Sequence, residues 1–181
     1  MMMWSGASTG MIESPLKIVC DSGPIIHLDE LNCLHLLADF REILISNIVY
    51  KEIKRHRRID FKQLDLPVIL LPEKIPDTEF LLTLCRIFSL DAGEIEALAY
   101  MEKNPEAIFI TDDASARLVA AQMGFKVHGT IGILIRSIRR GQMQAEEILH
   151  IIKNIPERTT LYIRPSLLNE VILKVKQEFN L

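Results

Sequence analysis

Acidic residues in this sequence follow several apolar segments that are expected to form strands. Asp21 directly follows one apolar run, and the pair Asp112–Asp113 directly follows another. In open parallel sheets, active sites collect in the crevice beyond the carboxyl ends of the strands. Glu94 is expected in the first turn of a helix, and Glu52 two turns into another helix, so either could face the same crevice. The spacing therefore predicts a group of carboxylates at one edge of a sheet.

Carboxylates placed close together repel one another, so such a group is stabilised by protonation, by basic partners or by a hard cation. Ligand sets made only of oxygen favour Mg²⁺ or Mn²⁺. His27, six residues after Asp21, is the only histidine close to a strand-end acid in the sequence, which makes zinc a weaker proposal. Two divalent ions about 4 Å apart would activate water and stabilise the leaving oxygen in phosphodiester hydrolysis. The acids thus indicate a metal-dependent nuclease.

Each acid also has a structural explanation when it is taken alone. Asp21 could cap a helix after a strand, and either residue of the Asp112–Asp113 pair could cap the next helix. Glu94 could complement a helix dipole, and Glu52 could be a solvated surface acid. Only the joint placement of the acids supports a metal site.

The order of strands and helices predicts an α/β fold. Apolar runs predict strands at 16–20, 42–45, 107–111 and 125–128, with a further short strand or extended segment at 67–71. Helices are expected from Pro24 with a break near Asn32, after a Ser46 N-cap, from an Asp77 cap to Phe88, after an Asp91 cap, and over 114–123, 131–140, 145–154 and 166–179. Alternating strands and helices predict a parallel sheet with helices on both faces.

Composition is typical of one globular domain of 181 residues with a formal charge of -3. The three widely spaced cysteines, Cys20, Cys33 and Cys85, argue against a disulfide framework and fit a reducing cytoplasm. We expect neither secretion nor a membrane anchor, because no apolar run reaches the length that spans a bilayer. Residues 1–15 read as a flexible N-terminal tail.

Four local motifs occur in one order: IVCDSGPIIHL, ISNIVYKEI, LDAGEIEALAY and IFITDDASARLVAAQMG. Together they resemble the PIN-domain family, and in particular its branch of uncharacterised proteins similar to the toxins of toxin–antitoxin pairs. The resemblance covers residues 16–141. It implies a three-layer α/β/α fold with a central, mostly parallel sheet. Residues 142–181 are then expected to form a C-terminal helical extension packed on the same domain.

The resemblance also implies an activity and a set of metal ligands. The implied ligands of Mg²⁺ or Mn²⁺ are Asp21, Glu52, Glu94 and one of Asp112 and Asp113. The spacing from Thr111 favours Asp113. Ser22 supplies the small polar residue that usually follows the first acid, but the next position, often Ser or Asn in the family, is Gly23. The implied activity is cleavage of single-stranded RNA, with a small antitoxin protein and a second copy of the chain as partners.

A basic segment surrounds Glu52 and could bind a phosphate backbone. Residues 51–58 (KEIKRHRR) hold five Lys or Arg in eight positions. A solvated helix end is an equally good explanation of this run. The candidate nucleic-acid contacts are Lys51, Lys54, Arg55, Arg57, Arg58 and Arg117, and a second basic face would comprise Arg136, Arg139 and Arg140. The alternative function is a non-catalytic module that binds RNA or a partner protein.

Overall fold

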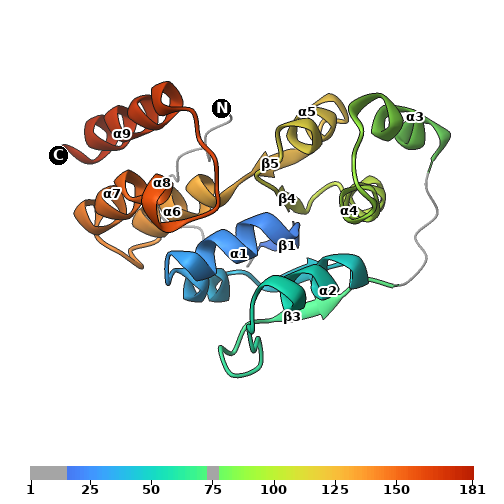
Figure 1. The fold of residues 1–181 in the computed structure, drawn as a ribbon, viewed down its shortest axis with the longest axis horizontal. Coiled ribbons are helices and arrows are strands. Elements are labelled where there is room, and N and C mark those ends of the chain that lie inside the picture. Colours follow the sequence, from blue (N-terminus) through green and yellow to red (C-terminus); the bar gives the residue numbers. More distant parts are fainter. Residues whose placement is uncertain (1–15, 73–77) are drawn as a thin grey trace.

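A computed structural model describes residues 16–72 and 78–181 of the protein. In this part of the chain five strands form one sheet in the order β3-β2-β1-β4-β5, and every strand pairing is parallel (Figure 1). The strands are β1 (Lys17–Cys20), β2 (Glu42–Ile45), β3 (Val68–Leu70), β4 (Ile108–Ile110) and β5 (Lys126–His128). The predicted α/β/α class with a parallel central sheet is confirmed.

The strand order creates a switch point between β1 and β4. From β1 the chain moves outward through β2 and β3, and it then returns to place β4 on the other side of β1. The two strands pair with Val19 opposite Phe109, and the Asp21 N–H continues the ladder to the Ile110 carbonyl at 2.9 Å. Ligand sites of open α/β sheets lie at such switch points, outside the carboxyl ends of the strands.

Alternate strand residues supply the two halves of the hydrophobic core. Ile18, Ile43 and Ile108 face the layer that contains α1 (Ser22–Glu30), α2 (Asn47–His56) and α6 (Thr130–Arg139). Val19 and Phe109 face the layer of α3 (Glu79–Phe88), α4 (Ala92–Lys103) and α5 (Ala114–Gln122). Strands buried on both faces are apolar throughout, which explains why they read as continuous hydrophobic runs.

Most predicted helix boundaries are confirmed by the capping residues. The Ser46 hydroxyl accepts the N–H of Val49 at 3.1 Å, and α1 begins at Ser22, two residues before the predicted start. The break near Asn32 is real: this residue has a φ of 57°, and the short 3-10 helix Leu34–Asp39 follows. The predicted Asp77 cap lies outside the described residues, and Thr78 caps α3.

The C-terminal segment folds into α7 (Ala145–Lys153), α8 (Ile155–Arg158) and α9 (Pro165–Phe179). Figure 1 shows these helices together with α6 at the end of the molecule opposite α3. Ile148, Ile152 and Val171 join the same core cluster as Ile133 of α6. The expected N-terminal tail, 1–15, lies outside the described residues. No helix in the described ranges is long and apolar enough to cross a membrane.

The second basic face is engaged in contacts within the protein. Arg136 is buried, pairs with Asp39 and stacks its guanidinium 4.7 Å from the ring centre of Phe40. Arg139 pairs with Glu178 of α9 at 2.8 Å, and Arg140 also reaches Asp39. These arginines join α6 to its neighbours. The basic pattern in the sequence does not show whether such arginines form internal ion pairs or bind phosphate.

Candidate functional site

A cleft of about 380 Å³ lies at the β1–β4 switch point. All five acids singled out in the sequence line it: Asp21, Glu52, Glu94, Asp112 and Asp113. Strand ends deliver three of these acids and helices deliver the other two, so the five acids come from four separate segments of the chain. The structure thus brings together every carboxylate predicted for the metal site.

Asp21 is held at the end of β1 by two hydrogen bonds. It caps α1 through Oδ1, which accepts the N–H of Ser22 at 2.7 Å, and its Oδ2 accepts the Thr111 hydroxyl at 3.2 Å. Burial, followed by the negative charges of Asp91 and Glu52, raises the pKa of Asp21 from 3.8 to about 6. An acid held here in its charged form needs a compensating positive charge.

Glu94 is buried, with only 6% of its surface exposed, at the start of α4. It forms a capping box with Asp91: each residue's side chain accepts the backbone N–H of the other at 2.9 Å. Burial, with added repulsion from Asp91, Asp113 and Asp21, raises the pKa of Glu94 from 4.5 to about 7. The expectation of a helix-start position is correct, and the site around it is strongly acidic.

Asp112 and Asp113 have different surroundings. Asp112 accepts Nδ1–H of His27 at 2.8 Å, the N–H of Thr130 at 2.8 Å and the Thr130 hydroxyl at 2.5 Å. Asp113 caps α5 through Oδ1, which accepts the N–H of Ala116 at 2.8 Å. Within the described residues no donor is bonded to its Oδ2, so Asp113 keeps an oxygen for a ligand while both oxygens of Asp112 are engaged.

Thr111 connects the two strand-end acids. Its buried hydroxyl donates to Asp21 and accepts the N–H of Asp113 at 3.1 Å. One side chain therefore fixes both carboxylate-bearing turns with respect to each other. Ser22, the other predicted supporting residue, is buried at the cleft and contributes its backbone N–H to Asp21.

Gly129 leaves the space that Asp112 occupies. A Cβ at this position would lie 2.3 Å from Asp112 Oδ1 and 3.1 Å from the Thr111 carbonyl oxygen. We expect Gly129→Ala to displace the Asp112 carboxylate and to lower the free energy of unfolding by about 1–3 kcal/mol. Urea unfolding measures the change. Gly124→Ala is not a suitable control, because Gly124 has a φ of 77° and alanine would be strained there for a different reason. A wild-type midpoint for Gly129→Ala would contradict this packing.

The donor set of the cleft fits a hard divalent cation. Its side chains offer oxygen atoms, the donors preferred by Mg²⁺ and Mn²⁺. Across 16–72 and 78–181, no three His, Cys, Asp or Glu side chains form a ready-made metal group. Mg²⁺ is usually held by one or two carboxylates and keeps several waters, so its binding does not require a closed protein cage.

Sequence reasoning missed several residues of the cleft. Asp91 was assigned only as a helix cap, although it also lines the cleft and raises the pKa of Asp21. His27 holds Asp112 from α1, and its position one to two turns after Asp21 was the only available signal. Residues 160–162, from the segment before α9, form one wall. Nothing in the local sequence of that segment indicates its approach to the acids.

The candidate nucleic-acid contacts divide into two groups. Lys54 donates to the Ile59 carbonyl, Arg57 pairs with Glu30 at 2.6 Å, and Arg117 donates to the Thr111 carbonyl at 3.2 Å. The other three candidates are exposed and have no ion pair within the part of the chain that the structure describes; they are Lys51, Arg55 and Arg58. Their binding of nucleic acid stays a prediction.

Comparison with known proteins agrees with the fold. A family model described as a PIN domain matches residues 17–177, a range that includes the whole sheet and most of α9. The match therefore continues past residue 141, where the resemblance noted in the sequence ended. No curated protein and no solved structure matches the chain. With the family model covering most of its length, the chain belongs to the PIN-domain family.

Proposed function

We propose that this protein is a Mg²⁺- or Mn²⁺-dependent endoribonuclease that cleaves single-stranded RNA. PIN domains have a nuclease-type fold, and the family match supports that general class. The observation that carries the proposal is the joint placement of Asp21, Glu52, Glu94 and Asp113 around one cleft at the switch point of the sheet. This arrangement concentrates negative charge where a cation and a phosphodiester could meet.

Asp21, Glu52, Glu94 and Asp113 are the residues that would hold the metal. When bound, a divalent cation supplies water activation and neutralisation of charge on the phosphate. The protein's own part is to fix these carboxylates: Thr111 joins Asp21 to Asp113, and the capping box holds Glu94. Because the pKa values of Asp21 and Glu94 are raised to about 6 and about 7, metal binding must displace protons near neutral pH.

The exposed cations beside Glu52 supply the proposed RNA contact. Lys51 precedes Glu52 on α2, and Arg55 and Arg58 follow it. Contacts between such cations and RNA phosphates give affinity without recognising the base sequence. The net charge of -3 is then no obstacle, because the contact is local.

The full-length protein tests this proposal directly. We expect cleavage of a mixed single-stranded RNA pool with Mn²⁺ or Mg²⁺ and none with EDTA. Millimolar Mn²⁺ should also raise the unfolding temperature, since a ligand at 100 times its Kd adds about 2.7 kcal/mol to the free energy of unfolding. Cleavage that persists in EDTA would contradict a metal-dependent mechanism, and stabilisation by Mn²⁺ without cleavage would contradict the nuclease activity.

A non-catalytic RNA- or partner-binding module is the second candidate. Its support is that the Glu94 carboxylate is already engaged in the capping box and that the described residues hold no preformed three-ligand group. This candidate predicts RNA or protein binding with neither cleavage nor stabilisation by Mn²⁺. The same two measurements therefore separate the candidates.

The proposal extends to partners through the likeness of the four motifs to toxins. We include a small antitoxin protein and a homodimer as part of it. Its support is the sequence resemblance, and neither partner is needed for the chemistry assigned to the cleft.

A further inference from the structure

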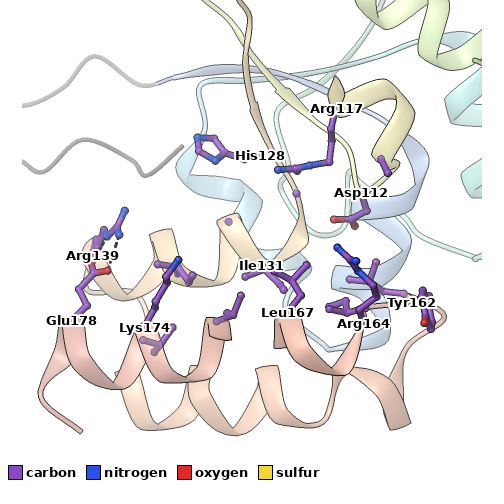
Figure 2. A pocket seen from close by; sticks show the side chains of 18 residues that line it. Asp112, Arg117, His128, Ile131, Arg139, Tyr162, Arg164, Leu167, Lys174 and Glu178 are labelled. Carbon is purple, nitrogen blue, oxygen red and sulfur yellow. Dashed lines mark hydrogen bonds and ion pairs between the residues drawn. The ribbon is translucent and has the colours of Figure 1, made fainter. Parts of the chain in front are cut away.

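A second cavity adjoins the acidic cleft. It has a volume of about 540 Å³ and lies between α6, α9 and the segment 161–164 (Figure 2). This volume is within the range of roughly 300–1,000 Å³ that is usual for small-ligand sites. Ile131 and Ile135 of α6 and Leu167 and Val171 of α9 give it apolar walls. We call it the α6–α9 pocket.

The α6–α9 pocket and the acidic cleft share part of their lining. Asp112, Leu161 and Tyr162 line both. The segment that carries Tyr162 is anchored to α1, because Glu30 accepts the N–H of Thr160 at 2.8 Å. A chain-like ligand could therefore pass from one cavity to the other beside Tyr162.

Tyr162 is unusually exposed for an aromatic residue at a cavity junction. Its surface is 82% accessible, so its ring is available to a ligand. Aromatic rings bind single-stranded nucleic acids by stacking on bases, whatever the sequence. The basic run 51–58 contains no Phe, Tyr or Trp, whereas Tyr162 of the C-terminal segment offers an exposed ring.

The charged residues of the α6–α9 pocket favour an anionic ligand. Figure 2 shows the cation Arg117 on one side of the pocket, near the acid Asp112, and the cations Arg164 and Lys174 on the α9 side. Lys174 pairs with Glu170 at 2.6 Å, and Arg117 contacts the Thr111 carbonyl. Arg164 is exposed at the start of α9 and has no acidic partner within 16–72 and 78–181. Its guanidinium is available to a phosphate.

We propose that the α6–α9 pocket is a subsite for one nucleotide of single-stranded RNA, next to the nucleotide whose phosphodiester lies in the acidic cleft. The base stacks on Tyr162 against the apolar wall, and Arg164 binds a phosphate. This inference rests on the proposed nuclease function. The combination of an apolar wall, an exposed aromatic ring and an unpaired guanidinium matches a nucleotide better than an entirely apolar ligand.

Binding of labelled oligonucleotides to the full-length protein in EDTA tests the subsite without cleavage. One probe is oligouridylate and the other is an abasic phosphate chain of equal length. We expect Tyr162→Ala to weaken oligouridylate binding roughly 5- to 150-fold, the range measured for loss of base stacking, and to leave the abasic chain unaffected. Tyr162→Phe should retain affinity. Arg164→Ala should weaken both probes and lower the salt slope by about 0.7.

Phe80→Ala and Arg86→Ala provide matched controls on α3, because Phe80 is 63% exposed and neither residue lines either cavity. Equal affinities of Tyr162→Ala and Phe80→Ala for oligouridylate would overturn the subsite, as would equal losses on both probes. Unchanged RNA binding by both pocket variants would overturn the subsite. If the wild type cleaves RNA with metal but Tyr162→Ala binds oligouridylate as well as wild type, the subsite alone is rejected. If Tyr162→Ala binds oligouridylate more weakly but the wild type cleaves no RNA, the nuclease function is rejected and RNA binding at the α6–α9 pocket is retained.

Discussion

Asp21→Asn is expected to lower the rate of RNA cleavage at least about 100-fold while the protein remains folded. Loss of a residue that only supports a metal ligand typically costs 10- to 100-fold, and a direct ligand should cost at least as much. Asn keeps an oxygen for the Ser22 N–H, and its amide can donate to the Thr111 hydroxyl. The measurement is a single-turnover cleavage rate with saturating Mn²⁺, together with the unfolding midpoint.

Asp60→Asn is the matched control for this change. Asp60 is an exposed acid that accepts the N–H groups of Lys62 and Gln63, and it lies outside the cleft. Its replacement removes one negative charge and should leave the rate unchanged. Wild-type activity of Asp21→Asn, with the same dependence on metal, would remove Asp21 from the site. A loss of rate accompanied by unfolding would instead assign Asp21 a structural role.

Glu94→Gln is expected to have opposite effects on stability and on metal binding. In the metal-free protein the folded state holds the Glu94 proton up to about pH 7, whereas the unfolded chain releases it near 4.5. Rising pH therefore favours the unfolded state across this window, and stability present below pH 4.5 is lost by pH 8. At 1.36 kcal/mol per pH unit, the upper limit of this loss is about 3 kcal/mol.

Gln removes the charge and preserves the capping box. Position 94 of this variant should therefore contribute little to the pH dependence of the free energy of unfolding. Without metal at pH 8, the variant should be more stable than wild type. It should also lose most of the stabilisation by Mn²⁺. Urea unfolding at pH 5 and pH 8, with and without Mn²⁺, measures both effects. Glu96→Gln on the same helix removes a carboxylate outside the cleft and should behave as wild type. A loss of stability from pH 5 to pH 8 as steep in Glu94→Gln as in wild type would contradict the assignment, because the contribution of Asp21 is common to both proteins.

The sequence was sufficient to predict five of the six acids that line the cleft, because parallel strands bring their carboxyl ends to one edge. Apolar runs located β1 and β4, and Asp21 and the Asp112–Asp113 pair followed from the positions of these runs. The raised pKa values were foreseeable in direction from like-charge repulsion, although burial is the larger cause. Local patterns thus identify which residues reach the edge of the sheet.

The spacing from Thr111 already favoured Asp113, but the different hydrogen bonds of Asp112 and Asp113 are visible only in the tertiary structure. The two are adjacent acids before one helix, and what separates them is contact with His27, 85 residues away, and with Thr130, 18 residues away. Tyr162 poses the same difficulty, because it lies at the junction of two cavities on a segment that is anchored to α1 through Glu30, 130 residues before Thr160. The spacing of hydrophobic residues indicates which face of one helix or strand is buried, but it does not indicate contacts with residues far away in the sequence.

The pairing of β1 with β4 also governs when the cleft can exist. Thr111 and Asp21 stand 90 residues apart in the chain, so the bond between them closes a long loop. Contacts between distant parts of a chain form slowly, because the entropy of loop closure is lost before the contact contributes. A growing chain on the ribosome cannot bring its carboxylates together until β4 has emerged. Synthesis of the N-terminal half alone therefore produces no assembled cleft.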